Sequence, residues 1–253
     1  MIICKKLNQN KPITTLKEWE LAFYTSYKAH QWKQKDRSAY QTAIHWLLTI
    51  PVEFNELIKN LNIKINVISP EHITPLDDFK GNSRNHDLCL LGKNTKNEPI
   101  IICIESKVDE PFGKEIGLYY QEIQDKKAKN LPSNADSRID SLCEVFFKSP
   151  NSKRVRFIKY QLLTAIAGTI AEAEINKVKT AYFFVQTFLS NNMDSKKHRQ
   201  NQRDLDYLIK ILSNNKVGIL HSGEIVGPFN ALNGSNNIPK EIDLYIGKYS
   251  IKI

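Results

Sequence analysis

The sequence predicts an α/β fold, a three-layer α/β/α sandwich around a mixed sheet. Apolar runs rich in β-branched residues alternate along the chain with segments whose apolar residues recur at helical spacing. The two kinds of segment follow each other in turn and do not form separate blocks. The 253 residues contain no internal repeat, Gly/Ser linker or low-complexity tract, so we expect a single domain over residues 1–253.

Helical patterns fill the first third of the chain and return after the central apolar runs. The helices are expected at residues 16–27, 38–48, 53–61, 114–129, 138–147, 156–174 and 204–212. Strands are expected at residues 63–68, 86–91, 100–107 and 181–188, with three short ones at 217–220, 242–246 and 249–253. Pro51 and Pro70 are expected to end the preceding helix and strand, because proline lacks a backbone N–H group.

Charge and cysteine content narrow the class of protein. The net charge of +9 favours a polyanionic partner such as nucleic acid, although a basic composition alone is equally typical of a lysine-rich proteome. No segment is apolar enough for a signal peptide or a membrane helix, so we expect a cytoplasmic protein without a membrane partner. Cys4, Cys89, Cys103 and Cys143 show no C-x-x-C spacing, and are expected to be reduced thiols that pack as small apolar side chains.

The candidate chemistry lies in the hairpin formed by residues 86–91 and 100–107. If its turn centres on Lys96, Asp87 and Glu105 stand opposite each other, with Cβ atoms about 5 Å apart. Two carboxylates this close repel unless a cation lies between them, and Mg²⁺ prefers such oxygen ligands. Lys107 shares a strand face with Glu105, where it can orient an attacking water and offset charge on a phosphate. Together, Asp87, Glu105 and Lys107 predict metal-dependent hydrolysis of phosphodiester bonds.

The spacing of Glu105 and Lys107 has a competing explanation. The pattern Asp/Glu-x-Lys occurs four times in the chain, at residues 78, 105, 125 and 194. Only the pattern at Glu105 follows a buried strand pattern and has an acidic residue on the preceding strand. Burial of such charges is costly without a purpose. The alternative is a cross-strand ion pair at the edge of the sheet.

Asp87, followed after a hairpin by Glu105-Ser106-Lys107, resembles the signature of the PD-(D/E)XK nuclease superfamily, which includes many restriction endonucleases. The resemblance implies a restriction-endonuclease-like αβββαβ core at about residues 38–188, with a helical insertion at about 112–150. A C-terminal helix and strands would occupy residues 200–253. It also implies a Mg²⁺-dependent endonuclease acting on DNA, as in restriction or phage defence, with Mn²⁺ as a substitute metal. Asp87 and Glu105 would hold the metal, and Lys107 would complete the catalytic set.

The chain departs from the superfamily pattern at two places. His86 precedes the first aspartate where proline is usual, and His86-Asp87 also matches the pair of residues in HD phosphohydrolases. The superfamily often adds a glutamate from its first core helix, but residues 38–48 contain no acid, so Gln41 or Glu53 would have to support the site. Gln161 resembles a polar residue that the helix after the hairpin directs at the site, and is equally compatible with a surface position.

Other polar residues have two explanations each. Asp109 and Glu110 could bind a second metal or, more simply, cap a helix that begins after Pro111. A basic run could contact phosphates or form a solvated loop; it comprises Lys196, Lys197, Arg199 and Arg203. The large aromatic residues are expected in the core and not as base-stacking platforms; they are Trp32, Trp46, Tyr119 and Tyr120.

Two classes of function are compatible with these residues. The first is the endonuclease described above. The second is a non-catalytic DNA-binding or protein-interaction module that keeps the nuclease fold. Retention of Asp87, Glu105 and Lys107 together favours the enzyme, since a binding module could lose this costly pair of carboxylates. The sequence leaves open DNA versus RNA, the target, endonuclease versus exonuclease action, and the oligomeric state, a homodimer included.

Overall fold

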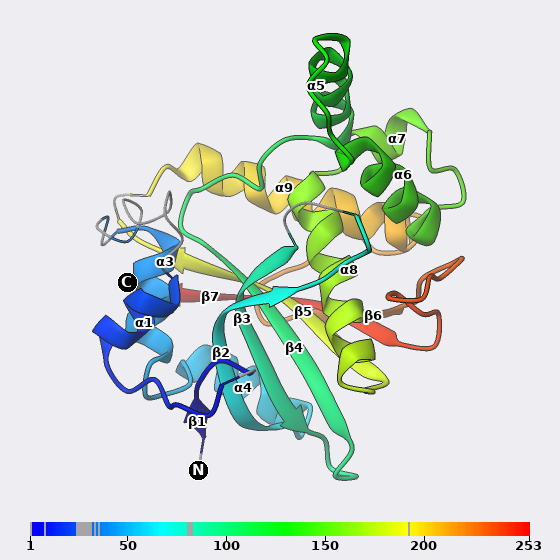
Figure 1. Cartoon of the computed structure of the whole chain (residues 1–253). Coiled ribbons are helices and arrows are strands. Elements are labelled where there is room, and N and C mark those ends of the chain that lie inside the picture. Colours follow the sequence, from blue (N-terminus) through cyan, green and yellow to red (C-terminus); the bar gives the residue numbers. More distant parts are fainter. Residues whose placement is uncertain are drawn as a thin grey trace.

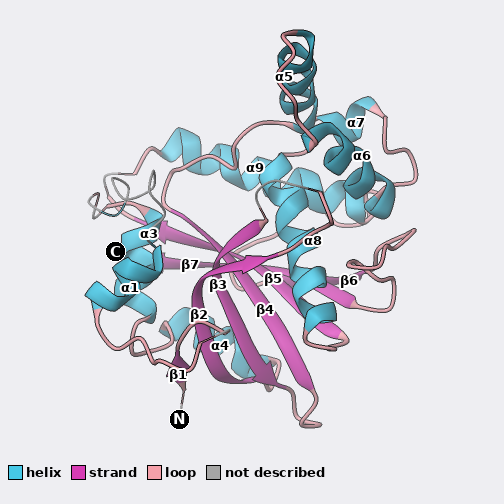
Figure 2. Cartoon of the chain, in the orientation of Figure 1, coloured by secondary structure: helices cyan, strands magenta, loops and turns pink. Residues whose placement is uncertain are grey.

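A seven-stranded mixed sheet runs through the protein, with helices on both faces (Figures 1 and 2). The computed structural model describes residues 2–7, 9–23, 32, 34, 36–79, 83–191 and 193–253. The strand order is β1-β2-β3-β4-β5-β7-β6. The strands are β1 (Ile3–Cys4), β2 (Lys64–Thr74), β3 (Arg84–Lys93), β4 (Pro99–Lys107), β5 (Thr180–Leu189), β6 (Ile225–Phe229) and β7 (Asp243–Lys252). The predicted α/β fold is confirmed.

The sheet has an antiparallel part and a parallel part that meet at β4. Strands β2, β3 and β4 are consecutive antiparallel neighbours, whereas β4, β5 and β7 run parallel. Parallel neighbours need long crossover connections. The crossover from β4 to β5 contains α5 (Ile116–Ala128), α6 (Ala135–Phe146), α7 (Lys153–Arg156) and α8 (Tyr160–Ile175), and α9 (Ser195–Leu212) follows β5. Helix α5 projects away from the sheet (Figure 1), in the segment predicted as a helical insertion.

Two apolar cores lie on opposite faces of the sheet. Helices α5, α6, α8 and α9 contribute to one, and α1 (Leu16–Phe23), α3 (Ser38–Trp46) and α4 (Val52–Asn60) to the other. Successive strand residues point to opposite faces, so Phe183 joins the first core and Phe184 the second. Trp32 and Trp46 are buried, as predicted, and the half-buried Tyr119 packs against the first core.

Strand β2 is longer than the sequence predicts, and the prediction that it ends before Pro70 is wrong. Pro70 pairs with Leu88 in the middle of β2, which continues to Thr74. The other neighbour, β1, pairs only with Val67 and Ile68, so this edge of β2 is open at the proline. A strand with one open edge tolerates a residue that lacks an N–H donor.

The C-terminal part also differs from expectation. Residues 217–220 are not a strand, β6 lies where none was predicted, and the two short strands expected after residue 242 form the single strand β7. Gly247 lies in the gap between those two predicted strands. A Cβ atom there would come within 2.2 Å of the Phe184 ring, so glycine allows close packing inside a continuous strand. Of the predicted helix at 16–27, α1 accounts for 16–23, and 24–27 lie outside the described residues.

None of the helices described in the structure is both long and apolar enough to cross a membrane.

Candidate active site

The hairpin of β3 and β4 has the register that the sequence predicts. Leu88 pairs with Ile104 and Cys89 with Cys103, and the paired part of the hairpin ends there, one residue before Asp87 and Glu105. The carboxylate of Asp87 reaches β4, where its Oδ2 accepts a hydrogen bond of 2.7 Å from the backbone N–H of Ser106. The two predicted metal ligands therefore lie side by side at the ends of neighbouring strands.

Glu105 is the most highly connected residue of the site and is 3% exposed. Its Oε1 accepts hydrogen bonds from Lys107 Nζ at 2.7 Å and from Gln161 Nε2 at 2.6 Å. Its Oε2 forms an ion pair with Arg84. Gln161 lies in the first turn of α8, and its Oε1 also accepts a hydrogen bond of 3.3 Å from Lys107. The structure thus brings Gln161 into the site, which the sequence left undecided.

The two acidic side chains have opposite shifts of pKa. Burial raises the pKa of Asp87 to about 8, and the negative charges of Glu105 and Glu71 add to the rise. Burial alone would also raise the pKa of Glu105, but the charges of Lys107 and Arg84 outweigh it and lower that pKa to about 2. Burial and neighbouring negative charge therefore favour the protonated form of Asp87, while Lys107 and Arg84 favour the ionised form of Glu105.

Glu71 is a third acidic residue at this site, and it was not predicted. It follows Pro70 on β2 and has a backbone φ of +46°, a region that residues other than glycine rarely adopt. Its Oε2 accepts a hydrogen bond of 2.7 Å from Asn85 Nδ2. A residue held in such a conformation is a recurrent feature of functional sites. The sequence reading missed it because the strand was expected to end one residue earlier.

Arg84 was also missed, because the predicted strand began two residues after it. The helix α8 packs closely on this part of β3 at Gly168, where a Cβ atom would come within 2.7 Å of Arg84 Cγ and 2.8 Å of His86 Nε2. His86 lies on β3, in agreement with its strand pattern, and is completely buried. The close approach of α8 holds Arg84 against Glu105.

An open cleft of about 770 Å³ lies next to these residues. Arg84 and Gln161, which both contact Glu105, line one part of it, and Asn134 and Arg138 of the α5–α6 segment line another. Among the described residues that line it, the charged ones are Arg84 and Arg138. Arg138 itself forms hydrogen bonds with the carboxylate of Asp77 at 2.6 and 2.8 Å.

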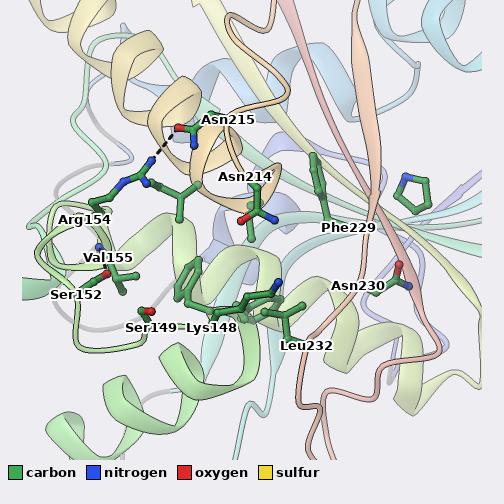
Figure 3. A pocket seen from close by; sticks show the side chains of 15 residues that line it. Lys148, Ser149, Ser152, Arg154, Val155, Asn214, Asn215, Phe229, Asn230 and Leu232 are labelled. Carbon is green, nitrogen blue, oxygen red and sulfur yellow. Dashed lines mark hydrogen bonds between the residues drawn. The ribbon is translucent and has the colours of Figure 1, made fainter.

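A separate cavity of about 450 Å³ lies between the end of α6, the end of α9 and β6 (Figure 3). Phe146 and Phe229 line it, and Arg154 donates a hydrogen bond of 2.8 Å to Asn215 at its rim. It shares no lining residue with the cleft beside Glu105. None of the described residues that line it carries a carboxylate.

The two residues predicted to support the site lie on helices of the opposite face. Glu53 is exposed in the first turn of α4, where its charge contributes to raising the pKa of Tyr249 on β7. The structure therefore does not bring Glu53 to the carboxylate pair. Gln41 lies on α3, one turn after Ser38, whose backbone N–H donates to Glu110 Oε1 at 2.9 Å. Gln41 thus lies on a helix whose first residue is hydrogen-bonded to the segment following Lys107.

The prediction that Asp109 and Glu110 cap the helix after Pro111 is wrong. Helix α5 begins at Ile116 and has no side-chain cap. Asp109 forms an ion pair of 2.7 Å with Arg37, and Glu110 accepts hydrogen bonds from the backbones of Ser38 and Val108. Glu110 thus satisfies a backbone N–H at the start of α3, a helix distant in the sequence, and Asp109 pairs with the side chain that precedes this helix.

The basic run lies in the first turns of α9 and is not a loop. Asp194 caps this helix by accepting from the N–H groups of Lys196 and Lys197 at 2.9 and 3.2 Å. The backbone N–H of Asp194 in turn donates to Asp109 at 3.2 Å, and Asn201 donates to the carbonyl of Glu110 at 2.8 Å. The start of α9 therefore adjoins the segment that follows Lys107. Its exposed basic side chains are Lys196, Lys197, Arg199 and Arg203.

Comparison with known proteins gives a family but no activity. No curated protein and no solved structure matches the chain. Residues 12–253 match the family described as Domain of unknown function (DUF6946). The match covers almost the whole chain, and the protein therefore belongs to this family.

Proposed function

We propose that the protein is a divalent-metal-dependent phosphodiesterase that cleaves DNA, an endonuclease of the type found in the PD-(D/E)XK superfamily. The observation that supports it best is the convergence of Asp87, Glu105 and Lys107 at the ends of two paired strands, with Gln161 added from α8. An ion pair at a sheet edge would need neither the second carboxylate nor the glutamine.

The donor atoms suit a magnesium ion. Asp87 and Glu105 offer carboxylate oxygens, the ligands that Mg²⁺ prefers, and Glu71 adds negative charge beside them. The raised pKa of Asp87 reflects burial and an excess of negative charge, which a bound cation would relieve. A bound Mg²⁺ supplies charge neutralisation at phosphate oxygens and makes a water molecule more acidic.

The protein's own side chains hold the remaining groups in place. Lys107 is 6% exposed and is fixed by Glu105, by Gln161 and by the ring of Phe112, whose centroid lies 5.2 Å from its Nζ. A preorganised ammonium group can orient the attacking water and stabilise charge that develops on the phosphate. Arg84 adds a second positive charge where Glu105 meets the cleft.

A cleavage assay tests the proposal. Supercoiled, linear and single-stranded DNA are incubated with the protein in Mg²⁺, Mn²⁺ or EDTA. We expect nicking or linearisation with either metal and none in EDTA, and no cleavage by Glu105→Gln. Inactivity of the wild-type protein on every DNA, combined with DNA binding, would replace the proposal with a non-catalytic binding module.

We expect the start of α9 to contribute phosphate contacts. Its four exposed basic side chains adjoin the segment after Lys107. Replacing all four with alanine should weaken DNA binding and reduce the slope of log K against log salt by about 3 to 4, because each phosphate contact releases a counterion. Affinity is measured by fluorescence anisotropy at several salt concentrations, with Ca²⁺ in place of Mg²⁺. The residues replaced are Lys196, Lys197, Arg199 and Arg203.

A matched control removes the same charge at the opposite end of the sheet. The control residues are the exposed Lys59, Lys64, Lys93 and Lys96. The control protein should keep the wild-type slope. An equal decrease in both proteins would show that overall charge, and not the start of α9, determines binding.

A further inference from the structure

A second group of potential ligands lies beneath α8, apart from the carboxylate pair. His72 on β2, Cys89 on β3 and Glu172 on α8 each direct a ligand atom to the same place, and these atoms all lie within 4.8 Å of one another. Cys89 is completely buried and Glu172 is 3% exposed. The three residues are far apart in the sequence, so no local spacing predicts the cluster.

The side chains of this cluster are oriented by neighbouring polar groups. Glu172 Oε2 accepts a hydrogen bond of 2.7 Å from Thr74, and its Oε1 accepts one of 2.8 Å from Asn176. His72 Nε2 lies 2.8 Å from Glu172 Oε2, within ion-pair distance. Hydrogen bonds that fix carboxylate ligands are typical of metal sites.

A second thiol adjoins the cluster. Cys103 pairs with Cys89 across β3 and β4, so the two thiols are neighbours in the sheet. His86, next to Cys103, is completely buried, and neither of its ring nitrogens has a hydrogen bond of ordinary length to the described residues. The surroundings of Cys89 are therefore rich in sulfur and imidazole groups, which favour a softer ion than Mg²⁺.

We propose that His72, Cys89 and Glu172 bind a zinc-type divalent ion. Thiolate, imidazole and carboxylate are the three ligand types that Zn²⁺ accepts. An open cleft of about 730 Å³, lined in part by His72 and Glu172, provides access for the ion. The ion would join β2 and β3 to α8, whose first turn carries Gln161. This proposal does not depend on the proposed function, which needs a different metal at different residues.

Cobalt binding tests the site directly. Metal-free protein, kept reduced, is titrated with Co²⁺ as a spectroscopic substitute for Zn²⁺. We expect one equivalent to bind, with a thiolate-to-cobalt charge-transfer absorption that Zn²⁺ abolishes. Saturating Zn²⁺ should raise the midpoint of thermal unfolding by roughly 10 °C, because it binds the folded state only. Absence of stoichiometric binding would overturn the proposal.

Variants identify the ligands and separate this site from the carboxylate pair. Cys89→Ser should lose the charge-transfer absorption, and His72→Gln, at a partly exposed position, should bind Co²⁺ at least tenfold more weakly. Cys143→Ser, which removes a buried free thiol on α6, and Asp87→Asn should both retain the absorption. Circular dichroism checks that each variant is folded. Retention of the absorption in Cys89→Ser, or its loss in Asp87→Asn, would contradict the assignment.

Discussion

Replacing Lys107 with alanine should lower the rate of DNA cleavage by a factor of about 100 or more while leaving DNA affinity nearly unchanged. The ammonium group acts on the attacking water and on charge that develops during the reaction, so its loss raises the barrier without weakening ground-state binding. The fold should survive, because Arg84 and Gln161 still contact Glu105. Single-turnover kinetics measures the rate, and anisotropy in Ca²⁺ measures the affinity.

Two further variants make this result specific. Lys96→Ala removes an exposed lysine at the turn of the same hairpin and should cleave at the wild-type rate. Asp87→Ala should be inactive because it removes a metal ligand, and excess Mn²⁺ should restore a little of its activity but none to Lys107→Ala. Cleavage by Lys107→Ala at the wild-type rate would show that the proposed mechanism is wrong.

The hairpin could be predicted because its signals are local. Two β-branched runs on either side of a polar turn determine a register, and the end of that ladder brings the Asp87 carboxylate to the residue after Glu105. The partners of this pair from other parts of the chain were less predictable. Gln161 is separated from Glu105 by 56 residues, and only the packing of α8 on the sheet brings them together.

Glu71 and the helical start of α9 were not predicted, for two different physical reasons. Pro70 normally ends a strand, but an open strand edge removed that penalty here and allowed β2 to continue through Glu71. The first turns of α9 are largely exposed and polar, so they lack the apolar periodicity by which a helix is recognised. Asp194, which caps the helix, was the available signal of its start.

The residue between Glu105 and Lys107 anchors the site from the other face of the sheet. Ser106 Oγ accepts a hydrogen bond of 3.0 Å from Gln186 Nε2 on β5. Gln186 Oε1 in turn accepts hydrogen bonds from Trp46 Nε1, at 2.7 Å, and from Tyr249. All four residues are buried. This network joins α3, β4, β5 and β7, so it holds the strand end that carries Glu105 and Lys107.

Replacing Gln186 with leucine should reduce the free energy of unfolding by about 3 kcal/mol or more. The two side chains have similar volumes, so the change opens little cavity. It leaves the N–H of Trp46 and the O–H of Tyr249 buried without an acceptor, and each unsatisfied group costs roughly 1–3 kcal/mol. Urea unfolding, extrapolated linearly to water, measures the loss.

A second substitution separates this cause from a general disturbance of packing. Tyr249→Phe should destabilise the wild-type protein, because it removes a buried hydrogen bond to Gln186. In the Gln186→Leu background the same change should recover stability, since it removes a hydroxyl that has lost its acceptor. The expected coupling energy is about 1–2 kcal/mol. Additive losses from the two substitutions would mean that packing around Gln186, and not its hydrogen bonds, stabilises this part of the sheet.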